Sequence, residues 1–199
     1  MRLGMSFTTS TSMASEFLLE FRKRRPQVQI ALTVTAPREL VQGLENGDFD
    51  LCGGLELPET TTLVRKQIFA TRMVGISAAS MHFPSKITLV EFCRRPLLLT
   101  SRRCATRVRL DRAFRRVGLK PTISMELDDI GTISSVVKTG VAVAILPETL
   151  ASGSRSLVVR RIIDLDVPVT GYFLHRRDVG EEAQTFMTTT LERIAPRLH

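Results

Sequence analysis

Two turns rich in hydroxyl side chains are the positions where this chain could bind a small ligand. The first turn covers residues 6–10 (SFTTS) and the second residues 100–103 (TSRR), and each follows an apolar strand and precedes an amphipathic helix. The start of a helix presents unpaired backbone N–H groups and the positive end of the helix dipole. Hydroxyl groups there can cap the helix or help to hold a small anion. Two such turns on two lobes would form the walls of a binding cleft.

A third turn carries two adjacent carboxylates, Asp128 and Asp129, directly before another predicted helix. Capping of that helix is one role for them. In the other role they would face the ligand, and an ionised carboxylate repels an anion unless Arg102, Arg103 or another cation offsets its charge. The guanidinium fork of Arg102 suits a carboxylate or a phosphate. The residues therefore leave open whether the ligand is anionic or carries a hydrogen-bond donor or a positive group.

The residues that commonly perform catalysis or bind metals do not form a recognisable arrangement. His82, His175 and His199 stand in no Ser/His/Asp or Cys/His pattern, and no G-x-S-x-G, phosphate-loop or HExxH motif occurs. The cysteines number 3 and lack metal-ligand spacing, so we expect reduced thiols and no disulfide framework. Cys104 has arginines around it and is the candidate for a redox role. We expect no catalytic residue, no metal and no cofactor, and we do not expect an enzyme.

The chain is basic, with a formal net charge of +8. Such a charge raises the possibility of nucleic-acid binding. The arginines, however, cluster in residues 21–25 and 102–116, which are amphipathic helical stretches whose charged faces we expect to be solvated. No zinc-finger, basic-zipper or aromatic RNA-binding motif is present. No apolar run approaches the roughly 20 residues that span a bilayer, and no secretory signal is recognisable, so we expect a cytoplasmic protein with no membrane partner.

Strand and helix patterns alternate along the chain. Helices are expected at residues 12–25, 37–44, 89–93, 104–117, 130–139 and 181–193, and strands at residues 1–6, 28–35, 50–55, 63–77, 96–99, 121–127, 141–146, 157–163 and 169–174. Such alternation predicts an α/β fold with mostly parallel sheets, in which ligands bind outside the carboxyl ends of the strands. All three turns follow predicted strands. Two lobes would be joined by hinge strands near residues 72–76 and 171–174.

Several short stretches in a fixed order carry a family resemblance. They are residues 3–8 (LGMSFT), 21–28 (FRKRRPQV), 40–51 (LVQGLENGDFDL), 114–121 (FRRVGLKP) and 137–147 (VKTGVAVAILP). Each stretch alone is weak, but their order and spacing together are strong. Over essentially its whole length the chain resembles the effector-binding domain of LysR-type transcriptional regulators.

The resemblance implies two Rossmann-like lobes similar to those of type 2 periplasmic binding proteins. Residues 1–73 plus 173–199 would form lobe I, and residues 74–172 would form lobe II. A small metabolite, expected to be anionic, would bind between the lobes. The implied contact residues are Ser6, Thr8, Thr9, Thr100, Ser101, Arg102, Asp128 and Asp129. Family members often carry Asn, Ser or Thr at the last two positions, so the aspartates are a departure.

The resemblance also implies partners. Members of the family form homodimers, with tetramers possible at full length, and contact DNA through an N-terminal winged helix-turn-helix that this chain does not include. Effector binding would then control DNA binding and transcription by the full-length dimer. An alternative is a solute-binding protein of a transport system with the same two-lobe architecture, which would need a signal peptide. A second alternative is an enzyme on the same scaffold, which would need a catalytic base. The sequence does not identify the effector, the target genes or the direction of regulation.

Overall fold

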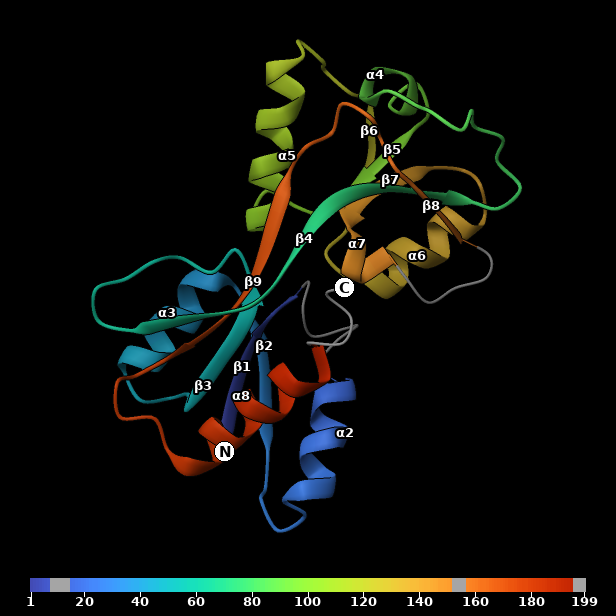
Figure 1. Cartoon of the computed structure of the whole chain (residues 1–199). Coiled ribbons are helices and arrows are strands. Elements are labelled where there is room, and N and C mark those ends of the chain that lie inside the picture. Colours follow the sequence, from blue (N-terminus) through green and yellow to red (C-terminus); the bar gives the residue numbers. More distant parts are fainter. Residues whose placement is uncertain (8–14, 152–156, 195–199) are drawn as a thin grey trace. The chain divides into compact units, whose positions relative to one another are not determined.

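The chain divides into two compact units, which are described separately. The computed structural model describes residues 1–7, 15–151 and 157–194 (Figure 1). Unit 1 comprises Met1–Ala70 and Thr170–His199, and unit 2 comprises Thr71–Val169. Two strands, β4 (Val64–Ala78) and β9 (Pro168–His175), pass from one unit to the other. The divisions expected from the sequence were 73/74 and 172/173.

Unit 1 contains a mixed sheet in the order β2-β1-β3-β9. Strand β1 (Arg2–Ser6) pairs in parallel with β2 (Ala31–Thr35) and with β3 (Leu51–Leu55), and β9 runs antiparallel to β3. Strands β1 and β3 are almost wholly buried, as their apolar sequences require. The parallel pairs place the ends of β1 and β2 at the same edge, so the turn after β1 begins at a carboxyl edge of the sheet.

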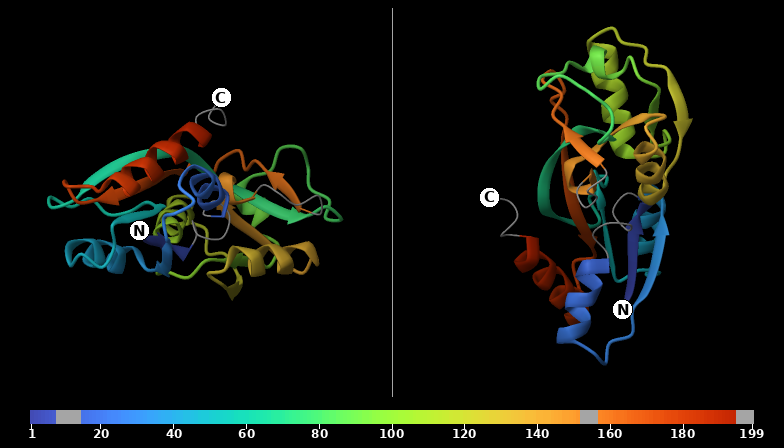
Figure 2. Two further views of the ribbon diagram at one scale, coloured as in Figure 1. Left: turned by 90° about the horizontal axis from the view of Figure 1, so that it is seen from below. Right: turned by 90° about the vertical axis from the view of Figure 1, so that its right-hand side faces the viewer.

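Helices cover both faces of the unit 1 sheet. Helices α2 (Ser15–Arg24) and α8 (Glu181–Ile194) lie side by side (blue and red in Figures 1 and 2), and the rings of Phe21 and Phe186 meet at 5.3 Å between centroids. Phe173 of β9 also packs on Phe186. The next residue, Leu174, instead joins the cluster around α3 (Pro37–Glu45). Because successive strand residues point to opposite faces, α3 covers the face opposite to α2 and α8.

Unit 2 contains a second mixed sheet. Strand β5 (Leu97–Leu99) lies between β6 (Ile123–Glu126) and β7 (Val143–Pro147) and is parallel to both. The unit 2 part of β4 runs antiparallel to β7 and to β8 (Leu157–Arg160). The helices of this unit are α4 (Leu89–Phe92), α5 (Ala105–Arg116), α6 (Ile130–Lys138) and α7 (Glu148–Ala151). The turns after β5 and β6 therefore lie at one carboxyl edge.

The α/β class expected from the sequence is confirmed. The sequence predicted mostly parallel sheets, whereas both sheets are mixed, because β9 and β4 run antiparallel to their neighbours. Most expected helices and strands occur within a few residues of their predicted bounds. The short helix α7 was not anticipated. The sequence predicted a strand at residues 28–35 from its alternating apolar residues, and β2 covers Ala31–Thr35. Leu32 and Val34 of this strand are exposed, and β2 is the edge strand of its sheet. Among the described helices, none is long and apolar enough to cross a membrane.

Candidate functional site

The first hydroxyl turn begins at the end of β1 with Ser6, which is buried. A Cβ atom added to Gly54 of β3 would lie 2.7 Å from Ser6 Oγ, so this glycine makes room for the Ser6 side chain. At the neighbouring Gly53, an added Cβ atom would lie 3.3 Å from atoms of Met5 and Phe173, so these side chains occupy the space beside that glycine. The pair of glycines therefore serves packing between protein side chains. The other two predicted contact residues of this turn, Thr8 and Thr9, lie outside the described residues.

The second hydroxyl turn follows the buried strand β5. Thr100 is only 5 % exposed, and its carbonyl oxygen accepts a hydrogen bond from Arg107 Nη1 at 2.5 Å. Its hydroxyl Oγ1 has no hydrogen-bond partner within the described ranges 1–7, 15–151 and 157–194. A hydroxyl group that is almost enclosed and still unpartnered is available to an external group. Thr100 thus remains a candidate contact residue.

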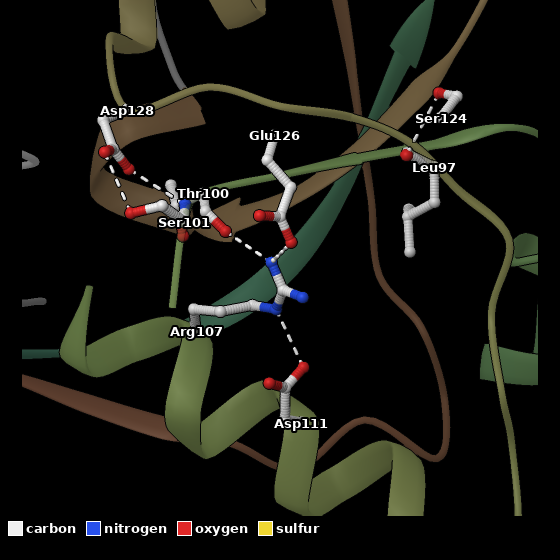
Figure 3. Close-up of polar contacts among 8 residues, drawn as sticks. All are labelled: Leu97, Thr100, Ser101, Arg107, Asp111, Ser124, Glu126 and Asp128. Carbon is white, nitrogen blue, oxygen red and sulfur yellow. Dashed lines mark hydrogen bonds and ion pairs between the residues drawn. The ribbon is translucent and has the colours of Figure 1, made fainter. Parts of the chain in front are cut away.

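Ser101, the next residue, is already engaged by Asp128 (Figure 3). The Asp128 carboxylate accepts one hydrogen bond from the Ser101 backbone N–H and one from Ser101 Oγ, both at 2.9 Å. The sequence proposed both residues as ligand contacts, and the structure does bring them together. The two residues bind each other directly, because β5 and β6 are a parallel pair and the residues that follow them are neighbours.

Asp129 has a separate task at the start of α6. Its carboxylate accepts hydrogen bonds from the backbone N–H of Thr132 at 2.6 Å and from Thr132 Oγ1 at 2.7 Å. These hydrogen bonds lower the pKa of Asp129 below its ordinary value. The side chain is therefore an ionised N-cap, which was one of the two roles left open by the sequence.

A buried arginine that sequence reasoning missed connects the site to α5. Arg107 is 1 % exposed, and its Nε donates to Asp111 Oδ1 at 2.8 Å while Nη1 donates to Glu126 Oε1 at 2.9 Å (Figure 3). Burial lowers the pKa of Arg107, but its hydrogen bonds to the carboxylates of Asp111 and Glu126 outweigh this effect and raise the pKa overall. The guanidinium is thus permanently charged, and it fixes the Thr100 carbonyl from beneath the turn.

This arginine could have been found from helical periodicity. Arg107 lies three residues before Leu110 and seven before Phe114, so it falls on the apolar face of α5 and not among the solvated arginines. Asp111 follows at the i+4 position, where a carboxylate can meet it.

Arg102, the arginine of the second turn, is exposed and lines an open groove of about 470 Å³ along α5, together with Val108, Arg115 and Leu119 among others. Within the described part of the chain, none of the ion pairs involves Arg102, Asp128 or Asp129. Arg102 was one of the cations that could offset the aspartates, and it forms no ion pair with them; its role as a ligand contact stays a prediction.

The cysteines show no arrangement for metal or disulfide chemistry in the described segments. Burial raises the pKa of both Cys52 and Cys93 to about 12, which makes their thiols poor nucleophiles. Cys104 occupies the N-cap position of α5, and its Sγ lies 3.0 Å from Thr106 Oγ1.

Comparison with known proteins assigns the chain to a family. The model of the LysR substrate binding domain matches residues 1–195. The chain belongs to the LysR substrate-binding domain family. A curated relative, the HTH-type transcriptional regulator GltR of Bacillus subtilis, is 25 % identical over 185 residues, which cover 89 % of this chain and 60 % of GltR.

Solved structures of effector-binding domains share the fold. The effector-binding domain of QuiR in complex with shikimate matches with a TM-score of 0.78 and 16 % identity, covering 100 % of this chain and 98 % of that domain. The regulatory domain of CcmR from Synechocystis PCC6803 in complex with 2-PG matches with a TM-score of 0.82 and 20 % identity, covering 97 % and 96 %. The fold is therefore that of LysR effector-binding domains, with two lobes of the type 2 periplasmic-binding-protein kind.

The curated relatives are longer than this chain. The chain spans 43–60 % of their lengths. All eight are transcriptional regulators by name, seven of them with the HTH-type designation.

Proposed function

We propose that this domain senses a small-molecule effector for a LysR-type transcriptional regulator. The effector would contact the turn that follows β5 in unit 2 and the hydroxyl residues that follow β1 in the sequence of unit 1. The state of the domain would then control DNA binding by a helix-turn-helix elsewhere in the full-length protein. Shikimate and 2-PG, the molecules bound by QuiR and CcmR, show the size of ligand that this fold accommodates.

The observation that carries this proposal is the Thr100 hydroxyl. It stands at the carboxyl end of a buried parallel strand, where ligands bind in such sheets. It is nearly enclosed and has no partner in the described part of the chain. The residues around it are held by Arg107 and Asp128, so the turn is organised before any ligand arrives. A ligand that meets a preorganised turn loses less entropy on binding.

The experiment is a thermal-shift screen of the domain against small metabolites, followed by calorimetry on each hit. A ligand at 100 times its dissociation constant adds about 2.7 kcal/mol to the folded state. Thr100→Val removes the hydroxyl and keeps the shape, and we expect it to weaken a hit by about 2- to 12-fold, the value of one hydrogen bond of roughly 0.5–1.5 kcal/mol.

Thr122→Val is the matched control, because Thr122 is an exposed threonine in the same unit. Equal binding of a hit by the parent and Thr100→Val would place the effector elsewhere. A screen over carboxylates, phosphorylated compounds, polyols and amines in which nothing binds would count against an effector-sensing role for the isolated domain.

A homodimer is the second part of the proposal, and it is supported by strand β2. This edge strand pairs on one side only, and its Leu32 and Val34 are 38 % and 37 % exposed. Natural proteins seldom leave an apolar strand edge uncovered. We expect Val34→Lys to shift the domain towards the monomer in sedimentation equilibrium. Val64→Lys, at a valine that is also 37 % exposed, should leave the association unchanged; equal effects of the two variants would contradict the assignment.

A cytoplasmic location and the absence of enzyme activity belong to the same proposal. A regulator works in the compartment that holds its DNA, and it needs no catalytic residue of its own. The curated relatives favour this role over that of a solute-binding protein for transport.

A further inference from the structure

The geometry points to Asp128 as a residue that determines which chemical groups can bind at the turn after β5. We propose that its carboxylate occupies the place of an anionic ligand group at Ser101, so that this part of the site rejects carboxylates and phosphates and accepts hydroxyl or ammonium groups. The inference rests on the proposed function, because it assigns the chemistry of the same effector site.

The first argument concerns hydrogen-bond donors. An anion that binds in a turn is held by backbone N–H groups and nearby hydroxyl groups. At this turn the Ser101 N–H and the Ser101 hydroxyl proton both go to the two oxygens of Asp128. These are the bonds that an incoming carboxylate would make. An anionic ligand group would have to displace Asp128, which would leave that carboxylate without its partners.

The second argument concerns charge. In the described ranges Asp128 has no cationic partner, and the Asp129 carboxylate next to it is also ionised. In the described part of the chain, the buried cation near the turn is Arg107, and it is already shared between Asp111 and Glu126. An anion arriving here would therefore meet the like charge of Asp128 with no buried cation to offset it, and compensation would be left to the exposed, solvent-screened side chains of Arg102 and Arg103.

The third argument concerns what remains available. Ser101 Oγ keeps its lone pairs after donating to Asp128, the carboxylate oxygens can accept further bonds, and Thr100 Oγ1 has no partner in the described segments. The Asp128 oxygens and Ser101 Oγ can only accept here, whereas the Thr100 hydroxyl can donate or accept. A ligand hydroxyl or ammonium group that donates to Ser101 and Asp128 therefore satisfies these atoms, whereas an anion could pair only with the Thr100 hydroxyl.

The test is a titration of the ¹⁵N-labelled domain with sodium phosphate at pH 7, following the Ser101 amide resonance against sodium chloride of equal ionic strength. In the parent protein we expect the two salts to give the same small shift. In Asp128→Ala, which frees the Ser101 N–H and hydroxyl, we expect a saturable response to phosphate that is at least tenfold tighter than any in the parent. Asp166→Ala is the control, because it removes one exposed negative charge from unit 2 without touching the turn.

Two results would overturn the inference. One is a saturable phosphate response of Ser101 in the parent comparable to that in Asp128→Ala, and the other is no gain in the variant. If Asp128→Ala does not fold, the parent titration alone decides, because an open anion site would respond there. The phosphate titration needs no effector, so it tests the role of Asp128 separately from effector sensing. Effector sensing is tested by the comparison of the parent with Thr100→Val.

Discussion

Replacing Arg107 by methionine should destabilise unit 2 more than any exposed substitution on α5. Arg107 is 1 % exposed, and its guanidinium serves two carboxylates and the Thr100 carbonyl. Arg107→Met keeps much of the side-chain volume but leaves these acceptors without their cation. Removing one partner of a buried ion pair costs roughly 3–5 kcal/mol.

The exposure of the two carboxylates reduces this figure. The Asp111 and Glu126 side chains are 26 % and 45 % exposed, so water can solvate both after the arginine is lost. We therefore expect the lower end of the range, about 3 kcal/mol. Arg107→Lys keeps the charge but cannot reach all three acceptors at once, because an ammonium group lacks the guanidinium fork, and its cost should be intermediate.

Urea unfolding followed by circular dichroism measures the free energy of unfolding of each variant. Arg112→Met is the control, since Arg112 is exposed on the same helix, and its cost should lie within about 0.5 kcal/mol of zero. Adding Asp111→Asn to Arg107→Met should recover part of the loss, because it removes one of the unpaired charges. A cost for Arg107→Met below about 1 kcal/mol, or no recovery in the double variant, would refute the reasoning.

Three further outcomes follow from packing and ionisation. Gly75→Ala would place its Cβ 2.6 Å from a buried phenyl ring and should cost about 1–3 kcal/mol by urea unfolding, whereas at Gly180 the nearest atom is 3.9 Å away and alanine should be neutral. Cys52 and Cys93, whose pKa is about 12, should stay unmodified by Ellman's reagent at pH 8 until the protein unfolds; rapid labelling of either would contradict their burial. The folded pKa of Asp129 lies below its ordinary 3.8, so its cap stabilises α6 above about pH 4 and is lost as the pH falls through that lowered value. Asp129→Ala should lower the free energy of unfolding by about 1 kcal/mol at pH 7, and its thermal midpoint should fall less than that of the parent as the pH drops below 4. Equal pH dependence of the midpoint in the parent and the variant would show that the cap is weak.

The sequence predicted the order of helices and strands well, because hydrophobic period and turn residues are local signals. Leu51–Leu55 reads as a buried strand and is buried throughout. The exposure of β2 was not predictable in the same way. Its apolar alternation resembles that of any half-buried strand, and only the strand order shows that it lies at an edge.

The sequence predicted the turns that carry the candidate residues, but it did not predict the hydrogen bonds within them. Sequence placed Ser101 and Asp128 in the same region, yet it could not show that they bind each other, because this depends on the pairing of β5 with β6. The partner of Asp129 is local, three residues along the chain, and capping was foreseeable. Arg107 was counted among solvated arginines, although its place on the apolar face of α5 marked it as buried.

The division of the chain has a consequence for its synthesis. Unit 2 is a continuous insertion, whereas unit 1 is assembled from both ends of the chain. Within this domain, β1 and α2 are synthesised before unit 2, but their layer is complete only when β9 and α8 follow, more than a hundred residues later. Until α8 is made, Phe21 of α2 has no Phe186 to cover it, whereas unit 2 has all its residues as soon as Val169 is made. We therefore expect α2 to be the part of this domain that is exposed to aggregation for longest during synthesis.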